Sequence, residues 1–526
     1  MYMKNPLILA IDIGTQSLRA GLVNKKGEIE YIVKDKYNPP YQTTFKGEAV
    51  QDADFYYDTM IKAIKKLKAE AKKDFERIEG LTLDTIRDTA VMLDKDFKPL
   101  HKCIIWVDQR FASGSMENRP AIHRFLFKVL GLDETMRLNI RKSMSIWYQE
   151  NRPDLWEQMK YYGNLSSYLT YKITSQWADS PASMTGHFPM NFKKCEYYKS
   201  EKSLTNIFRI PVEVLPRLVP QGEIIGKVNQ EFSKLTGVKE GLPMISCGSD
   251  KSCETLGCGL LSNDVAAVSY GTASTIEVTT KKYRSPEPFL PAYPFALKGY
   301  YNMEVQIYRG YWMINWFLKN FCHFNLTSDK ELIETLNKFN QRMTKIPAGS
   351  DGLILQPYWQ PGLSRPLAKG AIIGFSSDHT SAHFYRAIIE GIAYALREGF
   401  EYFEKKNHQK IHAIKISGGG SQSDEICQIT ADIFGVPVKR VQTYETSVLG
   451  AGIAGFLGLK EFVNAEQAIK FMVHDKDVFK PDIKQHKIYN TLFKDGYKKM
   501  YPQLKPIYKD MFEFIHLDDK FANKSK

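Results

Sequence analysis

Apolar runs that end at small or polar residues recur along the chain. Residues 7–23 (LILAIDIGTQSLRAGLV) give an apolar run, a polar segment with a glycine, and an alternating run, which together predict a β-hairpin. Residues 387–397 (AIIEGIAYALR) place apolar side chains at helical spacing. Residues 446–455 (TSVLGAGIAG) predict a further helix, whose small residues would allow tight packing against a glycine-rich segment at 417–424. Both strands and helices are therefore expected.

The first predicted hairpin recurs in the second half of the chain. Residues 10–17 (AIDIGTQS) and 267–274 (AVSYGTAS) share Ala, Gly, Thr and Ser at a constant offset of 257 residues. Such a spacing predicts two similar domains whose turns face one ligand cleft; the alternative is a chance coincidence of two small-residue turns. Asp12 becomes Ser269 in the second copy. The first copy is therefore expected to handle metal and charge, and the second to supply hydroxyl and N–H donors.

Two further apolar runs, residues 81–94 and 104–110, each predict a buried strand with polar groups at its end. These groups are Arg87 and Asp88 in the first run, and Trp106, Asp108 and Arg110 in the second. An aromatic face beside charged groups suits a sugar, because ring carbons stack on the aromatic face while hydroxyls form hydrogen bonds. A structural salt bridge is the alternative for the second run.

Residues 244–261 place Gly-Ser-Asp after an apolar run and before a helix-like stretch. Asp250 in this motif fits either a helix N-cap or a general base.

Residues 414–424 (IKISGGGSQSD) predict a strand that ends in three glycines and opens a helix. Free helix N–H groups attract anions, and glycine admits a close ligand, so the segment has the form of a phosphate or nucleotide cradle. Ser423 stands where a G-x-G-x-x-G motif requires glycine, which argues against a Rossmann dinucleotide site.

The composition is that of a globular protein: 526 residues with 43% hydrophobic and 25% charged side chains, enough for two to four domains. The formal net charge of +13 is spread along the chain without a basic block, so a Lys-rich solvated surface is favoured over a nucleic-acid partner. Seven cysteines lack metal-ligand spacing, and the N-terminal run is too short for a signal peptide. We expect a soluble, cytoplasmic protein with no membrane or nucleic-acid partner.

The ordered set of motifs resembles the FGGY carbohydrate kinases. They are DIGTQSLRA (12–20), WVDQR (106–110), CGSD (247–250), YGTAS (270–274), EGIAYALR (390–397), SGGGSQSDEICQITADIFGVPV (417–438) and ETSVLGAGIAG (445–455). The resemblance implies an α/β protein with two ribonuclease H-like domains of the actin-like ATPase fold. Each domain would have a mixed five-stranded sheet flanked by helices, with ATP and sugar in the cleft between them. The expected divisions are an N-terminal domain at 1–259, a C-terminal domain at 260–475 and a helical extension at 476–526.

The resemblance also implies roles for individual residues, with ATP and Mg²⁺ as cofactors. Asp250 would be the catalytic base that takes the proton of the acceptor hydroxyl, and it would lie at the metal site together with Asp12, which acts through water. The cofactor-binding residues would be Asp12, Gly14, Thr15, Gln16 and Arg19 in the first hairpin, Gly271 and Thr272 in the second, and Gly418, Gly419, Gly420, Ser423 and Asp424 at the adenosine. The substrate-binding residues would be Arg87, Asp88, Trp106, Asp108, Asp250 and Lys251.

The acceptor stays open at this point. Arg87-Asp88-Thr89 looks like the Arg-Glu-Thr run of glycerol kinases and the Met-Arg-Glu run of autoinducer-2 kinases, and departs from the corresponding runs of xylulose and ribulose kinases. Lys251 beside the base would either recognise an anionic acceptor or form a structural ion pair. A homodimer is expected from the resemblance. The alternative function is an actin-like or chaperone-like ATPase switch without sugar kinase activity.

Overall fold

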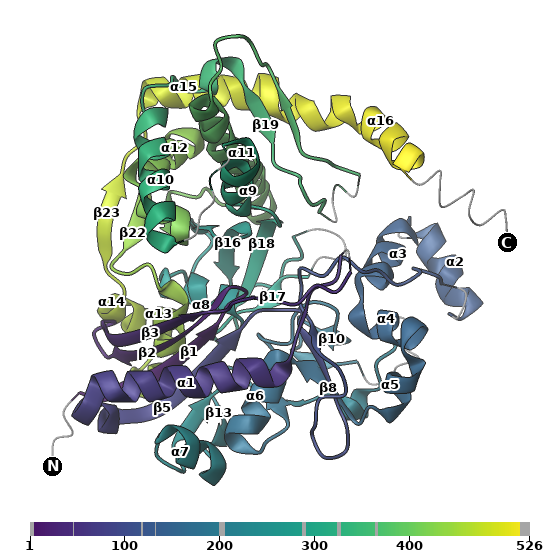
Figure 1. Cartoon of the computed structure of the whole chain (residues 1–526), viewed down its shortest axis with the longest axis vertical. Helices are drawn as coiled ribbons and strands as arrows, with labels where there is room; N and C mark the ends of the chain where they lie inside the picture. Colours follow the sequence, from purple (N-terminus) through teal and green to yellow (C-terminus); the bar gives the residue numbers. More distant parts are fainter. Residues whose placement is uncertain are drawn as a thin grey trace. The chain divides into compact units, whose positions relative to one another are not determined.

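A computed structural model describes residues 5–45, 47–116, 119–131, 133–198, 206–286, 291–322, 324, 328–362, 365 and 367–515. The chain divides into two compact units (Figure 1). Unit 1 comprises residues 1–261, 279–303 and 445–474, and unit 2 comprises 262–278, 304–444 and 475–526. The division predicted at 259 and 475 stays a prediction, but the contacts place the segment 445–474 with the N-terminal half of the chain.

Unit 1 is built on a mixed sheet with four helices packed close to it. Its strands, in sheet order, are β13 (Ile224–Lys227), β14 (Pro243–Ile245), β5 (Ile78–Thr85), β1 (Leu7–Ile13), β2 (Ser17–Asn24) and β3 (Ile29–Lys36). The strand β1 runs antiparallel to β2 and parallel to β5, and β5 runs parallel to β14. The expected mixed five-stranded sheet is therefore present as β3 to β14, and β13 extends its edge by antiparallel pairing with β14.

The remaining elements of unit 1 are helices and short strands. The helices are α1 (Ala53–Ala71), α2 (Ala121–Val129), α3 (Asp133–Lys142), α4 (Met144–Asn151), α5 (Pro153–Gln158), α6 (Leu165–Thr174), α7 (Gln230–Thr236), α8 (Asp250–Gly257), α13 (Thr446–Gly458) and α14 (Ala465–Met472). The short strands are β4 (Val50–Gln51), β6 (Ala90–Leu93), β7 (Cys103–Ile104), β8 (Tyr161–Asn164), β9 (Ala178–Asp179), β10 (Met190–Asn191), β11 (Glu196–Tyr197) and β12 (Arg217–Leu218).

Alternate side chains of β1 pack into two different hydrophobic cores, one on each face of the sheet. Leu9 and Ile11 pack in one core with residues of α1 and α6, whereas Ile8 and Ala10 pack in another with residues of α8 and α13. Because side chains alternate across a strand, Asp12 belongs to the face covered by α8 and α13. The hydrophobic pattern of one strand thus fixes the side on which its carboxylate lies.

The small-residue helix α13 packs tightly against α8, a partner that the sequence analysis did not name. A Cβ atom at Gly450 would lie 1.8 Å from the carbonyl oxygen of Cys253, and one at Gly257 would lie 1.9 Å from that of Thr446. Glycines on both helices let the two backbones touch, so this contact holds α8 in a fixed position on the sheet.

The predicted strand at residues 81–94 is two strands. The strand β5 ends at Thr85 and β6 begins at Ala90, with Asp88 between them at a φ of 51°. The polar turn at 86–89 therefore interrupts the apolar run, and β6 joins a separate four-stranded sheet in the order β4-β7-β6-β8. In the second predicted strand, only the residues of β7 are extended, and the segment around Trp106 is a turn.

Unit 2 is built on a seven-stranded sheet, and the last strand of the chain forms one edge of it. The order is β17 (Tyr293–Pro294), β18 (Tyr301–Ile307), β16 (Ser274–Thr280), β15 (Val265–Tyr270), β21 (Ala413–Ser417), β22 (Val438–Val441) and β23 (Asp475–Phe479). The strand β19 (Ile354–Gln356) pairs with β20 (Ala371–Ile373). The helices are α9 (Trp312–Phe321), α10 (Asp329–Met343), α11 (Ser381–Asn407), α12 (Asp424–Phe434), α15 (Ile483–Thr491) and α16 (Lys498–Ile515). This sheet contains the five expected strands from β18 to β22, with β17 and β23 added at its edges.

The C-terminal segment is part of the core of unit 2. Tyr489 on α15 donates its hydroxyl to Glu390 at 2.8 Å and accepts a hydrogen bond from Arg386 at 2.7 Å, all three being buried. The predicted helix at this end of the chain is therefore α15 and α16, joined by a π-helical turn at Leu492–Tyr497. Residues 516–526 of the predicted extension lie outside the described residues.

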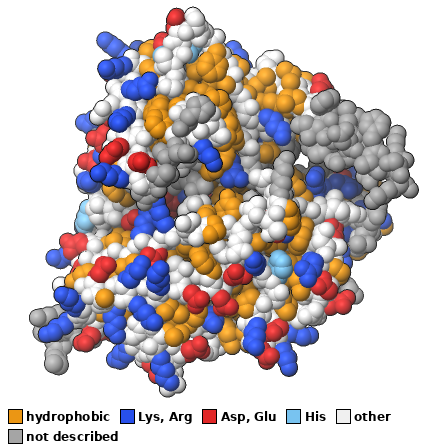
Figure 2. All heavy atoms as spheres, in the orientation of Figure 1, with side chains coloured by type: hydrophobic (Ala, Val, Ile, Leu, Met, Phe, Trp, Pro, Cys, Tyr) orange, Lys and Arg blue, Asp and Glu red, His pale blue; other side chains and the backbone are white. Residues whose placement is uncertain are grey.

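The surface carries both signs of charge. Figure 2 shows Lys and Arg side chains interspersed with Asp and Glu side chains over the face that it displays, without a block of one sign. None of the helices in the described part of the chain is long and apolar enough to cross a membrane.

Candidate active site

The turn between β1 and β2 is held by its own backbone and by a pair of charged side chains. The N–H group of Gly14 donates to the carbonyl of Ser17 at 3.0 Å, and Asp12 lies opposite Arg19 across the hairpin. The Arg19 guanidinium lies 3.2 Å from Asp12 and 2.5 Å from Glu445, which precedes α13. The side chains of Thr15 and Gln16 are half-buried and exposed, respectively, so both are available to a ligand.

Three carboxylates come from three neighbouring parallel strands. Asp12 is the penultimate residue of β1, Asp84 is the penultimate residue of β5 and the register partner of Asp12, and Asp250 follows β14. Because the carboxyl ends of parallel strands share one edge of a sheet, these side chains meet at the position where α/β proteins bind ligands. Asp12 is 4% exposed and Asp84 is fully buried. The sequence analysis did not single out Asp84, because it is one polar residue within the predicted strand at 81–94 and belongs to no motif.

Asp250 is the first residue of α8, and Ser249 occupies the N-cap position that the sequence analysis considered for Asp250. Burial raises the pKa of Asp250 to about 6, against the opposing effects of Arg87 and then Lys251. Its Oδ1 atom accepts a hydrogen bond of 2.7 Å from the N–H of Lys251. The Lys251 ammonium itself pairs with Glu254 at 2.5 Å, which supports its interpretation as a structural ion pair.

Asp88 has a partner that the sequence did not reveal. The Nδ1 atom of His187 lies 2.6 Å from the Asp88 carboxylate, and the backbone N–H of His187 donates to it at 3.1 Å. Burial would raise the pKa of Asp88, but His187 and Arg87 outweigh it and hold the pKa below its ordinary value. Lys142, on α3, faces this carboxylate, and burial lowers the pKa of its ammonium. Arg87 itself lies over the ring of Tyr293, 5.7 Å from its centroid.

Trp106 connects the acceptor-side motif to the first hairpin. Its indole N–H donates to the hydroxyl of Thr15 at 2.9 Å. Asp108 is buried, and its carboxylate accepts from the N–H of Ala49 at 2.7 Å and from Arg110, whose guanidinium stacks 4.5 Å from the Trp147 ring. The described contacts of Asp108 are thus those of the structural salt bridge that the sequence analysis kept as its alternative.

The donor set of unit 1 suits a hard divalent cation. Both carboxylate oxygens of Asp84 are buried without a hydrogen-bond partner among the described residues, and Asp12 lies beside them. No group of three or more His, Cys, Asp or Glu side chains in the described ranges could hold a metal ion by itself. This combination fits Mg²⁺, which usually takes one or two carboxylates and completes its shell with water and phosphate oxygens.

Unit 2 brings the second hairpin and the triple glycine together. Ser269 of β15 is the register partner of Ser417 of β21, so the turn at Gly271 and Thr272 and the glycines leave the sheet side by side. Gly418 has a φ of 79°, and a Cβ atom there would lie 2.8 Å from the backbone of Tyr270. A Cβ atom at Gly419 would meet no atom within 4 Å. The backbone at Gly419 is therefore open to a ligand, as an adenosine cradle requires.

The two hairpins are similar but not identical. In the first, Ile13 pairs with Leu18 across a turn of four residues, whereas in the second, Tyr270 pairs with Ser274 across a turn of three. The constant sequence offset conceals this difference of one residue.

Ser423 and Asp424 have structural contacts at the start of α12. The Ser423 hydroxyl accepts from the N–H of Ile426 at 3.3 Å as the N-cap, and Asp424 pairs with Arg440 at 2.6 Å. A short 3-10 turn at Gly419–Gln422 separates the strand from this helix. Both side chains thus stabilise the segment that carries the glycines.

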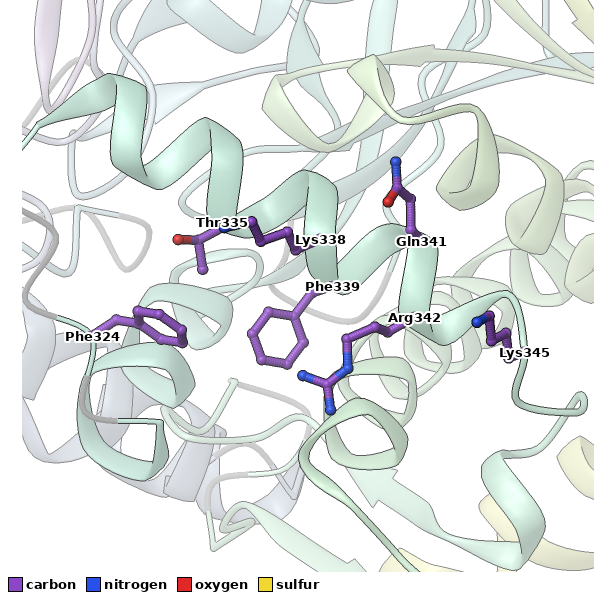
Figure 3. A pocket seen from close by; sticks show the side chains of 7 residues that line it. All are labelled: Phe324, Thr335, Lys338, Phe339, Gln341, Arg342 and Lys345. Carbon is purple, nitrogen blue, oxygen red and sulfur yellow. The ribbon is translucent and has the colours of Figure 1, made fainter.

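Unit 2 also has a pocket that none of the predicted site residues lines. It has a volume of about 360 Å³, and its lining residues are Phe324, Thr335, Lys338, Phe339, Gln341, Arg342 and Lys345 (Figure 3). The side chains of Phe324, Phe339 and Arg342 lie next to one another there, with the Arg342 guanidinium 5.3 Å from the Phe339 ring centroid. None of the motifs singled out in the sequence contributes to it.

The predicted site residues therefore form two groups, one in each unit. Comparison with known protein families identifies the family to which these two groups of residues belong. Residues 7–257 match the N-terminal domain of the FGGY family of carbohydrate kinases, and residues 266–459 match its C-terminal domain. The chain belongs to the FGGY carbohydrate kinases. As a member of that family it is an enzyme, a phosphotransferase whose acceptor is an alcohol group of a carbohydrate.

Relatives of this FGGY kinase extend over almost its whole length. It is 26% identical over 518 residues to the uncharacterized sugar kinase YgcE of Escherichia coli (strain K12), covering 98% of this chain and 97% of the relative. It is 25% identical over 519 residues to the xylulose kinase of Lactococcus lactis, covering 97% and 98%. A glycerol kinase of Saccharolobus islandicus is 26% identical over 499 residues, covering 92% and 94%.

Solved structures confirm the two-domain actin-like fold of the family. The crystal structure of gluconate kinase from Lactobacillus acidophilus aligns with a TM-score of 0.81 at 21% identity, covering 97% of this chain and all of that one. The ligand-bound xylulose kinase from the same organism also has a TM-score of 0.81 at 21% identity, covering 96% and 100%.

Proposed function

We propose that this FGGY kinase transfers the terminal phosphoryl group of ATP to a hydroxyl of a small sugar, ketose or polyol, with Asp250 as the general base. The observation that carries the proposal is the placement of Asp250. It lies at the start of α8, beside the carboxylates of the neighbouring strands, with a pKa of about 6. A base with that pKa is ionised at neutral pH and can still accept a proton late in the reaction.

The groups around Asp250 orient it. The N–H of Lys251 holds its Oδ1 atom, and Arg87 offsets the cost of burying its charge. The second carboxylate oxygen can then receive the proton of an acceptor hydroxyl. Orientation contributes more than basicity here, because the transition state of phosphoryl transfer is loose and its proton leaves late.

The phosphates of ATP would be held by the two hairpin turns. In unit 1, Thr15 and Gln16 offer donors and Arg19 a fixed positive charge. In unit 2, Thr272 offers a hydroxyl, while the N–H group of Gly271 donates to the carbonyl of Ala273 at 3.1 Å and so holds the turn. The open backbone at Gly419 would receive the adenosine. Mg²⁺ would supply charge neutralisation at the phosphates, with Asp12 as its protein partner. This assignment requires both turns to bind the same nucleotide.

The acceptor would lie against Arg87 and Asp88. The Asp88 carboxylate, fixed by His187, can accept hydrogen bonds from acceptor hydroxyls, and Arg87 can donate them. Relatives named as xylulose kinase and glycerol kinase, and a solved gluconate kinase, place ketoses, polyols and aldonates in the set to be tested.

The experiment is coupled ADP release in the presence of Mg²⁺ against glycerol, ketopentoses, ketohexoses, deoxyketoses, alditols, aldonates and the autoinducer-2 precursor. The proposal expects ADP release that depends on one class of acceptor. ADP release at background with every acceptor, from protein that binds ATP, would contradict it and favour an ATPase switch of the same fold.

A further inference from the structure

We propose that Asp84 is a second carboxylate of the magnesium site, so that Asp12 and Asp84 together hold the cation that accompanies ATP. The inference rests on the proposed function, because it concerns the metal of that reaction. It adds to the metal site a residue that the motifs do not contain, one strand away from Asp12.

The first support is the position of Asp84 in the sheet. Leu81 and Leu83 of β5 pack in the core that contains α1, so Asp84 points to the opposite face, which Asp12 shares. Register pairs both carboxylates across adjacent parallel strands. The helix α8 with Asp250 closes the same face, since the core on this side contains Cys253 and Leu256 of that helix.

The second support is that no N–H or O–H group among the described residues donates a hydrogen bond to the Asp84 carboxylate. It is fully buried, and neither of its oxygens has a hydrogen-bond partner within the described residues. Other buried aspartates of unit 1 are satisfied: Asp179 receives hydrogen bonds from the hydroxyls of Ser166 and Ser167 and from the N–H of Ser180. Burial and the adjacent Asp12 raise the pKa of Asp84 well above its ordinary value, and the two carboxyl groups lie close enough to share a proton. A buried pair of carboxyl groups is costly unless a proton or a cation neutralises it, and Mg²⁺ would take the place of that proton.

The third support is the charge balance around the pair. Asp12 interacts there with Asp84, Glu254 and Glu445, and Asp84 interacts with Asp250 as well. Three cations oppose these acids. Arg19 forms ion pairs with Asp12 and Glu445, and Lys251 forms one with Glu254. Arg87 interacts with Asp250. A fourth cation, the half-exposed Lys34, lies 3.9 Å from the Glu445 carboxylate. Acids remain in excess, and oxygen ligands with excess negative charge are the ligands that Mg²⁺ and Mn²⁺ prefer.

The test is a titration of the full chain with Mn²⁺, followed by electron paramagnetic resonance, with and without saturating ADP. The variants are Asp84→Asn, which keeps the shape of the side chain, and Asp84→Ser as a smaller second choice. The matched control is Thr82→Val, because Thr82 lies on the same face of β5 and its hydroxyl also has no hydrogen-bond partner among the described residues. Unfolding midpoints with and without Mg²⁺ confirm that each variant folds and give an independent measure of metal binding.

We expect wild type and Thr82→Val to bind Mn²⁺ equally, and the Asp84 variants to bind it at least about tenfold more weakly. Mg²⁺ should raise the unfolding midpoint of wild type more than that of Asp84→Asn. Equal Mn²⁺ affinity in wild type and a folded Asp84 variant would overturn the inference. Its failure is distinct from that of the proposed function: acceptor-dependent ADP release with unchanged Mn²⁺ affinity removes only the role of Asp84.

Discussion

Arg19 and Glu445 form an ion pair of 2.5 Å that joins the first hairpin to the start of α13. The same guanidinium lies 3.2 Å from Asp12, so one cation bridges two carboxylates that are far apart in the sequence. The Asp12 side chain is 6% exposed and those of Arg19 and Glu445 are 20% and 28% exposed, which makes the group poorly hydrated.

Removal of this cation should destabilise unit 1. Arg19→Ala removes the cation that lies between Asp12 and Glu445, and we expect the free energy of unfolding to fall by about 2–4 kcal/mol. Urea denaturation measures the change. The control is Arg152→Ala, which breaks the exposed pair with Asp154 and should cost less than about 1 kcal/mol. Equal losses in the two variants would contradict a special role for Arg19.

The contact between α8 and α13 should not tolerate a methyl group. In Gly450→Ala the new Cβ would meet the backbone of Cys253, and backbone cannot rotate away, so the helices must separate. We expect a loss of at least about 2 kcal/mol in the free energy of unfolding. Because α8 carries Asp250, kcat should fall as well. A variant with wild-type stability and kcat would show that this packing does not position the base.

Two adjacent glycines of unit 2 should respond differently to alanine. Gly419→Ala adds a methyl group in open space, so stability should stay within about 0.5–1 kcal/mol of wild type. The KM for ATP should rise, since the methyl group would occupy the place that we propose for the nucleotide. Gly418→Ala combines a positive φ with a contact to the Tyr270 backbone, and should lose about 1–3 kcal/mol of stability.

Thermal unfolding and ATP kinetics of both variants separate these effects. An unchanged KM for ATP in a folded Gly419→Ala variant would remove this glycine from the nucleotide site.

Asp179 should make the stability of unit 1 depend on pH. Burial raises its pKa to about 6, above the ordinary value of 3.8, so the folded chain binds this proton more tightly than the unfolded chain. Its contribution is fully present below about pH 4 and is lost as the pH rises through about 6. The stability of wild type minus that of Asp179→Asn should therefore fall by up to about 3 kcal/mol between pH 4 and pH 7. A difference that is constant over this range, measured by urea denaturation, would contradict the assignment.

The local parts of the fold could be predicted from the sequence. Both hairpins, the helix at 387–397 and the strand before the glycines follow from alternation, helical spacing and turn residues, which act over a few positions. The polar turn at 86–89 was missed because the apolar residues on its two sides form one continuous pattern. The position of α13 was missed because small residues show that a helix packs closely, but not against which partner.

The site could be predicted only where a motif marks it. Asp250 and the glycines stand in recognisable segments, whereas His187 and Lys142 meet Asp88 through tertiary contacts that no local pattern encodes. Asp84 could have been found from its strand, because a carboxylate at the end of a buried apolar run requires a partner. From the sequence, Asp108 could either bind a sugar or form a structural salt bridge. Only the structure shows that Ala49 and Arg110 donate hydrogen bonds to its carboxylate.

The central claim is that Asp250 is the base of a phosphoryl transfer to an acceptor hydroxyl. The direct measurement follows the phosphorylated acceptor by ³¹P NMR with wild type, Asp250→Asn and the surface control Asp154→Asn, after ATP binding is confirmed for each. We predict that wild type and the control form the product, while Asp250→Asn binds ATP normally and loses at least about 10²-fold in kcat. Product formation by a folded Asp250→Asn variant at the wild-type rate would contradict the account.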